Sequence, residues 1–479
     1  MEEVYVLMLI LYFVMGTVIA YLSKKAGIKS TEDYYVAGYR LGGLLSALTY
    51  AATTYSAFMM IGLVGFAYAT GVGAFGFENM YLLATIFFLG FFAPRVWKLA
   101  HERRWISPAE MLGDLYGSKS LSLIIGLIYL IALIPYATAQ LVGIGNLFEG
   151  LGAGYVIGVL FGVFIIFVWT VLAGIWSVAS TDVYQGLWMI SASLSFIFWI
   201  VFFLLPGKGL QVIDALGVLS EKGYLGLTSF WSPVVFVSFT VPWIFFAVTN
   251  PQVVQRIYMP RDKKALETMI KYFALFGLSY TIIVVLIGLF ARSLSFLGLF
   301  PVLNNRDLVT PTLLSLTNPL LGSFVFVSII AAAVSTLNSI ILTLTSSIAH
   351  DVLRLSRKDV KKSILVGRIV LVIISITTGL LALAKPGFVV ELSVLSSTIL
   401  LSLAVPTIYA WIFPEKTLGK GFAATLSVLY GSILSIVLSL VYGARKLFVI
   451  TLLGLPVPLF IVASSTIVFF IVMLALKKP

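Results

Sequence analysis

Apolar runs of about 20 residues recur from one end of this sequence to the other. Hydrophobic residues make up 60% of the chain and charged residues only 10%, whereas a soluble domain has about 25% charged residues. Each run is long enough to cross the hydrocarbon core of a bilayer as a helix. The sequence therefore predicts an all-α polytopic membrane protein, with the lipid bilayer as its surroundings and no soluble domain between the spans.

Apolar windows, together with the charged residues between them, predict about 13 helical spans. Two glutamates and no basic residue precede the first run, so we interpret it as a true span and not as a secretory signal peptide. The expected spans cover residues 4–23, 43–70, 76–98, 121–148, 155–173, 181–205, 234–255, 271–291, 319–350, 363–383, 387–412, 421–443 and 448–476.

Most of the 31 lysine and arginine residues lie in alternate connections between these spans. Because basic residues remain on the cytoplasmic side of a membrane, they predict a multi-pass cell-membrane protein with its N-terminus outside and its C-terminus in the cytoplasm. The same loops account for the formal charge of +12, and no nucleic-acid partner is expected. The sequence leaves the oligomeric state open, and a single chain is expected to be sufficient for function.

The chain lacks cysteine and contains two histidines. The missing thiols exclude disulfides, thiolate metal sites and cysteine nucleophiles. The scarcity of histidine argues against a histidine-based metal centre, and no paired-aspartate motif points to catalysis within the membrane. The sequence therefore predicts a protein that is not an enzyme and has no catalytic residues.

The expected span 43–70 carries a dense cluster of hydroxyl groups. Six of the eight side chains from Thr49 to Ser56 have one, and several glycines follow. A lone hydroxyl in a membrane helix usually bonds to the carbonyl four residues earlier. This density, together with the glycines, instead predicts an interrupted helix, whose unpaired carbonyls are tolerated only beside a cavity. Freed carbonyls are hard oxygen ligands, which suit a hard cation.

A second hydroxyl cluster lies in the expected span 319–350, in the stretch SIIAAAVSTLNSIILTLTSS that begins at Ser328. Its small residues let another helix approach closely, and the Ser335 hydroxyl faces the carbonyl of Ala332, three residues earlier. If the two clusters meet, they offer roughly five neutral oxygens and no carboxylate, which is unsuited to a divalent ion. The combination predicts a site for a monovalent ion such as sodium.

Two of the expected spans, 43–70 and 234–255, carry signs of interruption. Glycines mark the first, and Pro242 and Pro251 mark the second. The two spans run in opposite directions and lie five apart in order. Broken spans in corresponding positions are a sign of inverted repeats in secondary transporters.

Six motifs occur in an order that resembles one known family, the sodium:solute symporters, whose members share the LeuT-type fold. The pattern of site residues is most similar to that of sodium/proline and pantothenate-like members, and the similarity extends over about residues 5–415. The motifs are STEDYYVAGYRLGG (30–43), SAFMMIGLVGFAY (56–68), TAQLVGIGNLFEG (138–150), STDVYQ (180–185), NPQVVQR (250–256) and AAAVSTLNS (331–339).

The resemblance implies a ten-helix core of two inverted repeats, 43–205 and 234–412, within a single transmembrane transporter domain of residues 1–479. One extra span at 4–23 precedes the core, and two more within 421–476 follow it. The implied function is sodium-coupled symport of a small organic solute by alternating access, with sodium as the coupling ion.

Two other mechanisms stay open from the sequence: a proton-coupled carrier and a passive uniporter or channel for a similar solute. A proton relay normally needs a titratable group at the coupling site, and a channel needs a continuous lining of charges or carbonyls. The neutral hydroxyl clusters favour the sodium-coupled carrier.

Matched residue by residue, the resemblance implies sodium ligands at the carbonyls of Ala52, Tyr55 and Ala332 and at the hydroxyls of Ser335 and Thr336. Proline carriers have an aspartate at the position of Thr54, which argues against strict proline specificity. Sugar carriers of the family have several polar groups around the sugar; Glu78 matches one of them, but the inner aromatic gate position is Phe246 and other polar positions are apolar here. The resemblance therefore implies an amino acid such as proline, or a small organic acid, in preference to a sugar. The expected solute contacts are Thr53, Thr54, Glu78, Tyr136, Gln140, Trp243, Phe246, Asn250 and Pro251.

Three acidic residues in the expected spans need an explanation, because a charge at membrane depth is costly. Glu78 either contacts the solute or lies near the outer end of its span. Asp182 either takes part in ion release or a second cation site, or it caps the start of its helix. The sequence assigns no role to Glu391.

Overall fold

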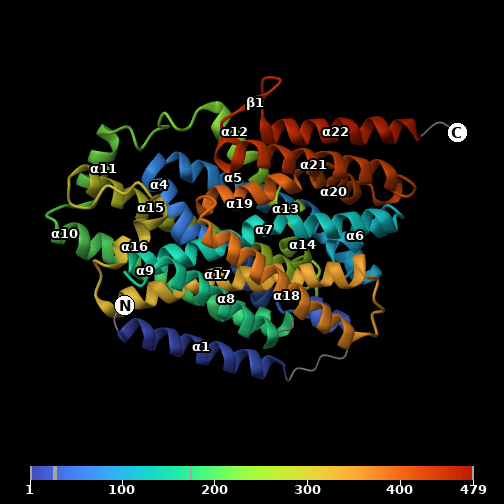
Figure 1. The fold of residues 1–479 in the computed structure, drawn as a ribbon, viewed down its shortest axis with the longest axis horizontal. Helices are drawn as coiled ribbons and strands as arrows, with labels where there is room; N and C mark the ends of the chain where they lie inside the picture. The colour runs from blue at the N-terminus through green and yellow to red at the C-terminus, as the bar shows by residue number, and fades with distance from the viewer. Residues whose placement is uncertain (1–2, 25–29, 173–174, 477–479) are drawn as a thin grey trace.

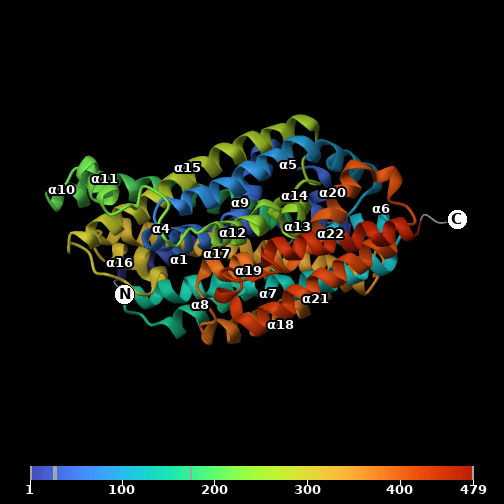
Figure 2. The same ribbon diagram turned by 90° about the horizontal axis from the view of Figure 1, so that it is seen from above.

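Long helices lie side by side in the computed structural model, which describes residues 3–24, 30–172 and 175–476 (Figure 1). The helices run along the long axis of the molecule in both views (Figure 2). The start of α1 (Glu3–Lys24) and the end of α22 (Val457–Ala475) lie at opposite ends of this axis. An odd number of spans produces this arrangement.

Eleven helices of the described residues are long and apolar enough to cross a membrane, and one bent helix pair adds a twelfth. A shorter apolar helix lies within α8, where a further span is expected. The prediction of about 13 spans therefore agrees with the fold. The intact spanning helices are α1, α5 (Gly73–Arg103), α7 (Lys119–Gly150), α8 (Tyr155–Leu172), α9 (Ile175–Trp199), α15 (Lys263–Phe296), α17 (Pro319–Ser347), α18 (Val360–Leu383), α21 (Gly421–Lys446) and α22.

Three spans are divided into shorter helices. The pieces are α3 (Gly43–Thr54), η2 (Phe58–Leu63) and α4 (Val64–Thr70) in the first; α12 (Pro233–Ile244), α13 (Phe246–Thr249) and α14 (Pro251–Arg256) in the second; and α19 (Val389–Leu400), η6 (Leu401–Leu403) and α20 (Ala404–Ile412) in the third.

The connections contain short helices and one small hairpin. These elements are α2 (Thr31–Val36), η1 (Ala37–Tyr39), α6 (Pro108–Leu115), η3 (Ile200–Leu204), α10 (Leu205–Gly207), α11 (Val212–Glu221), η4 (Arg306–Leu308), α16 (Val309–Leu314), η5 (Ile348–Val352), η7 (Pro414–Lys416), β1 (Thr451–Leu452) and β2 (Leu455–Pro456).

The last span begins later than the sequence pattern predicts. The expected start at residue 448 is wrong, because the antiparallel β1–β2 hairpin occupies that stretch and α22 begins at Val457. Gly454 makes the turn with a φ of +79°, a conformation that glycine adopts without strain. Proline is favoured in the first turn of a helix, and Pro458 lies there.

The first divided span bends by 50° between α3 and the helix that follows it. Three amide groups depart from the helical pattern: the Ala57 amide donates to Gln140 Oε1 (3.1 Å), the Phe58 amide to Ser56 Oγ (3.1 Å) and the Met59 amide to the Ser56 carbonyl (3.0 Å). In a regular helix these amides would bond to the carbonyls of Thr53, Thr54 and Tyr55. The diverted amides leave those carbonyls free for other partners, as the hydroxyl cluster predicts.

The second divided span is interrupted at Phe245 and again at Asn250, whose backbone is extended (φ −83°, ψ 116°). Pro251 is the first residue of α14, where its missing N–H removes no helical hydrogen bond. Pro242, in contrast, lies inside α12. The predicted interruption is confirmed, and of the two prolines only Pro251 lies at the break.

The outer part of the first divided span packs closely on α15. A Cβ added at Gly288 of α15 would lie 2.2 Å from the Val64 carbonyl oxygen, nearer than two unbonded atoms can approach. The α3 half packs on α9, α15 and α17. Both halves are therefore held within the bundle, with the break between them at its centre.

Candidate functional site

Carbonyls at the end of α3 face the hydroxyl cluster of α17. Ser335 Oγ donates to the Ala52 carbonyl (2.8 Å) and lies 3.0 Å from the Ala332 carbonyl. Thr336 Oγ1 lies 3.4 Å from the carbonyl of Ala52 and equally far from that of Thr53. All of these residues are buried. Contacts at hydrogen-bonding distance therefore connect four of the five expected sodium ligands.

The fifth expected ligand, Tyr55, lies at the end of α3 in an extended conformation (φ −89°, ψ 114°). Its amide makes the last hydrogen bond of α3, to the Ala51 carbonyl (2.8 Å), and its extended backbone ends the helix. The oxygens gathered here are carbonyls and hydroxyls. Neutral oxygens of this kind suit a weakly held monovalent ion better than a divalent ion, which usually recruits carboxylates.

Two of the expected solute contacts bond to the protein's own framework. Gln140 receives the Ala57 amide through Oε1 and donates through Nε2 to the Tyr136 carbonyl (3.2 Å). The hydroxyl of Thr53 lies 2.9 Å from Ser339 Oγ on α17. Gln140 thus stabilises the break in the first divided span, a role that its place in the motif TAQLVGIGNLFEG does not reveal.

Aromatic side chains from both divided spans meet beside the break. The Trp243 ring lies 5.1 Å from Phe58 and 5.2 Å from Phe246, centroid to centroid, and its indole N–H donates to Glu78 Oε2 (2.9 Å). The Tyr136 ring lies 6.1 Å from Phe246, and its hydroxyl donates to the freed Thr54 carbonyl (3.2 Å). The structure therefore brings the expected solute residues of α5, α7 and α12–α13 to one place.

The remaining expected contacts carry polar atoms that have no partner in the described part of the chain. The Thr54 hydroxyl is one and Asn250 Oδ1 is another, whereas the Asn250 amide nitrogen donates to Ser397 Oγ (3.2 Å) on α19. Both residues are buried. Buried polar groups normally find a hydrogen-bond partner, so these atoms are available to a solute.

Asp182 does not cap a helix: it lies inside α9 and is fully buried. Its Oδ2 accepts from the Thr49 hydroxyl (2.5 Å) and lies 3.9 Å from Arg256 Nη2. Arg256 also donates to Ser339 Oγ (2.7 Å), and Ser339 bonds to Thr53. Polar contacts thus run from the candidate sodium residues to Asp182. Arg256 closes the motif NPQVVQR, but its partner, 74 positions away, cannot be inferred from spacing.

Glu391 forms an ion pair with Arg306 of η4, and both side chains are more than nine-tenths buried. The Arg306 guanidinium lies 4.6 Å from the centre of the Phe66 ring on α4. The neighbouring Asp307 accepts the Val389 amide at the start of α19 (2.9 Å). This connection between α15 and α17 therefore ties α19 to the outer half of the first divided span, which explains the charge of Glu391.

Burial raises the pKa of Asp307 to about 7, whereas an unfolded aspartate titrates near pH 4. Between these values the folded chain holds a proton that the unfolded chain has lost, so the free energy of unfolding falls as pH rises from about 4 to about 7. Asp307→Asn keeps an acceptor for the Val389 amide and should remove this loss. Thermal unfolding of both proteins at about pH 4.5 and about pH 7.5 measures it. A difference between wild type and variant that is the same at both pH values would contradict the assignment.

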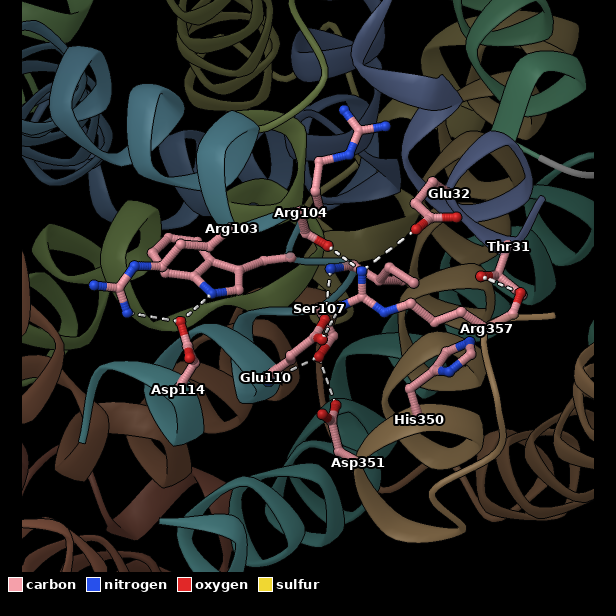
Figure 3. Close-up of polar contacts among 12 residues, drawn as sticks. Thr31, Glu32, Arg103, Arg104, Ser107, Glu110, Asp114, His350, Asp351 and Arg357 are labelled. Carbon is pink, nitrogen blue, oxygen red and sulfur yellow. Dashed lines mark hydrogen bonds and ion pairs between the residues drawn. The ribbon is translucent and has the colours of Figure 1, made fainter. Parts of the chain in front are cut away.

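A polar cluster joins three segments at the opposite end of the molecule (Figure 3). Arg357 pairs with Glu32 of α2 (3.3 Å) and with Glu110 of α6, and donates to the Arg104 carbonyl (2.8 Å). Ser107 caps α6 by accepting the Glu110 amide (2.9 Å). Since α2 leads into α3, the cluster fixes the segment that precedes the first divided span.

Comparison with known proteins agrees with this geometry. The model of the "Sodium:solute symporter family" matches residues 34–431. The chain belongs to the sodium:solute symporter family. It is therefore a multi-pass membrane transporter and not an enzyme, and it couples the movement of a solute to that of sodium. The resemblance inferred from the six motifs is confirmed.

Curated relatives of this symporter include the sodium/proline symporter of Staphylococcus aureus (strain JH9), 24% identical over 402 residues that cover 77% of this chain and 73% of that protein. An uncharacterized symporter of Bacillus subtilis (strain 168), YodF, is 33% identical over 132 residues, which are 28% of this chain and 26% of that protein.

Among solved structures, a Na+-coupled sialic acid symporter in a substrate-bound outward-open state superimposes with a TM-score of 0.78 at 19% identity, over 98% of each chain. That likeness supports the predicted LeuT-type fold of the symporter.

Proposed function

We propose that this symporter carries an amino acid such as proline, or a small organic acid, together with sodium bound between the α3 break and α17. The carbonyls of Ala52, Tyr55 and Ala332 and the hydroxyls of Ser335 and Thr336 hold the ion. The observation that carries this assignment is that both α17 hydroxyls lie at the Ala52 carbonyl. This carbonyl is at the helix break, where the Ala57 amide bonds to Gln140 and not to a carbonyl of α3.

The solute lies beside the same break, against side chains from both divided spans. Sodium at the break completes this solute site, and its loss toward the cytoplasm opens the inner side by way of Asp182. The named relative that transports proline supports a solute of this size. The proposed solute contacts are Thr54, Glu78, Tyr136, Trp243, Phe246, Asn250 and Pro251, with Thr53 and Gln140 holding the break in place.

One transporter domain with inverted repeats at 43–205 and 234–412 carries out the cycle, and a single chain is sufficient. Its place is the cell membrane, with the N-terminus outside. The strong excess of basic residues in alternate connections supports this orientation. The start of α1 and the end of α22 lie at opposite ends of the bundle, as an odd number of spans requires.

Uptake into proteoliposomes tests the proposal. With an inward sodium gradient, labelled proline or a labelled small carboxylate should accumulate above its equilibrium level, and dissipating the gradient should abolish accumulation. Parallel vesicles carry a pH gradient instead. Accumulation that follows the pH gradient and ignores sodium would establish a proton-coupled carrier, and equilibration without accumulation would establish a uniporter or channel.

A further inference from the structure

Glu78 differs from three other buried acids of the described chain, each of which has a basic partner or two hydroxyl partners. Asp182 lies beside Arg256, Glu391 pairs with Arg306, and Asp351 accepts the hydroxyls of Ser107 and Ser122. Glu78 lies in the second turn of α5 and is 1% exposed, and its carboxylate accepts a hydrogen bond from the indole N–H of Trp243. No ion pair joins it to a described Lys, Arg or His.

One indole N–H does not satisfy a carboxylate, whose two oxygens can accept about four hydrogen bonds. A carboxylate removed from water keeps its charge at low cost only beside a cation, and otherwise it takes up a proton. The described protein supplies none at Glu78, so the charge is matched only when a cation arrives from outside the chain.

The surroundings of Glu78 are aromatic. The Trp243 ring, which binds the carboxylate, is bordered by Phe58 (5.1 Å), Phe246 (5.2 Å), Phe77 (5.9 Å) and Tyr81 (5.9 Å). Aromatic faces attract organic cations, most strongly where water is excluded. Rings beside one carboxylate are therefore suited to an ammonium group.

Glu78 is also close to both interrupted spans. Phe58 follows the break after α3, and Trp243 and Phe246 border the first interruption at Phe245. A group bound between the carboxylate and these rings would touch both divided spans at once. Through Phe58 it would contact the break after α3, which contributes carbonyls to the proposed sodium site.

We propose that Glu78 is the counter-ion for a cationic nitrogen of the solute and that, with the rings around Trp243, it restricts transport to solutes carrying an ammonium group. This inference rests on the proposed function and narrows it. Amino acids are accepted, and organic acids without an amino group are refused.

The test compares solutes that differ at the nitrogen alone. Proline and N,N-dimethylproline carry the positive charge, whereas tetrahydrofuran carboxylate has the same ring with a neutral oxygen; alanine and propionate form a second pair. Binding to the purified protein in saturating sodium is read as ligand-induced thermal stabilisation. The charged members of each pair should stabilise the protein, and the uncharged members should not.

Glu78→Gln removes the charge and keeps the shape. Its affinity for the charged solutes should fall about 10- to 100-fold, while its melting temperature without solute should be equal or higher, because an unpaired buried charge is gone. Glu149→Gln is the matched control, since Glu149 pairs with Lys385 at a half-exposed position (2.9 Å), and it should bind like the wild type.

Equal binding of the uncharged partners would overturn the inference and leave sodium-coupled transport of a small carboxylate standing. Unchanged affinity in Glu78→Gln would overturn it as well. If glucose binds and Glu78→Gln abolishes its binding, the carboxylate accepts a hydrogen bond from a sugar hydroxyl. Both the inference and the proposed solute class are then wrong.

Discussion

Replacing both hydroxyls of α17, Ser335→Ala with Thr336→Ala, should raise the sodium concentration needed for half-maximal uptake by about 100-fold or more. Contacts between a polar group and a charge are each worth about 1.5–3 kcal/mol, and a tenfold change in affinity corresponds to about 1.4 kcal/mol. The variant loses two of five proposed ligands at a site without any carboxylate to compensate.

Ser328→Ala provides the control in the same helix. Its hydroxyl is buried but donates to the Val325 carbonyl of its own helix (2.8 Å), so its removal should leave sodium dependence unchanged. Uptake by the double variant is measured across sodium concentrations at fixed solute. A half-maximal concentration equal to that of the wild type would mean that sodium binds elsewhere.

The second large effect is expected at the buried pair of Asp182 and Arg256. Removing one partner leaves the other charge buried and uncompensated, which lowers the free energy of unfolding by about 3–5 kcal/mol. Asp182→Asn and Arg256→Gln should therefore each lower the melting temperature in detergent markedly. The double variant should recover much of the loss, because neither charge then remains.

Lys385→Gln is a suitable comparison, since it breaks a half-exposed ion pair with Glu149, and such pairs contribute little to stability. A double variant as unstable as the sum of the single variants would show that the two charges do not interact. The account of Asp182 as part of a polar route from the sodium residues would then lose its structural basis.

Local sequence was enough to predict the break in the first divided span. Hydroxyls from Thr49 to Ser56 provide alternative partners for the backbone, and the structure shows the Ser56 side chain in that role. It was not enough to identify Gln140, which receives the Ala57 amide from another helix. A long-range partner leaves no mark in local composition or periodicity.

The same limit explains the charged residues. Arg306 and Glu391 pair across 85 positions. Asp182 was open to interpretation as a cap because its helix was expected to begin near residue 181, whereas α9 covers Ile175–Trp199. The span predicted from hydropathy also included residues 448–456, because the hairpin in that stretch is apolar. Apolarity marks burial or lipid, and it does not by itself distinguish a helix from a short strand pair.

The most direct test of the account measures sodium and solute binding to the same purified protein. Two ligands that share one coupled site must each raise the affinity of the other by the same factor. Proline affinity is measured with and without saturating sodium, and sodium affinity with and without saturating proline. The account predicts two equal factors well above one, both lost in Ser335→Ala/Thr336→Ala. Proline affinity that is indifferent to sodium would contradict an ion site at the α3 break that completes the solute site.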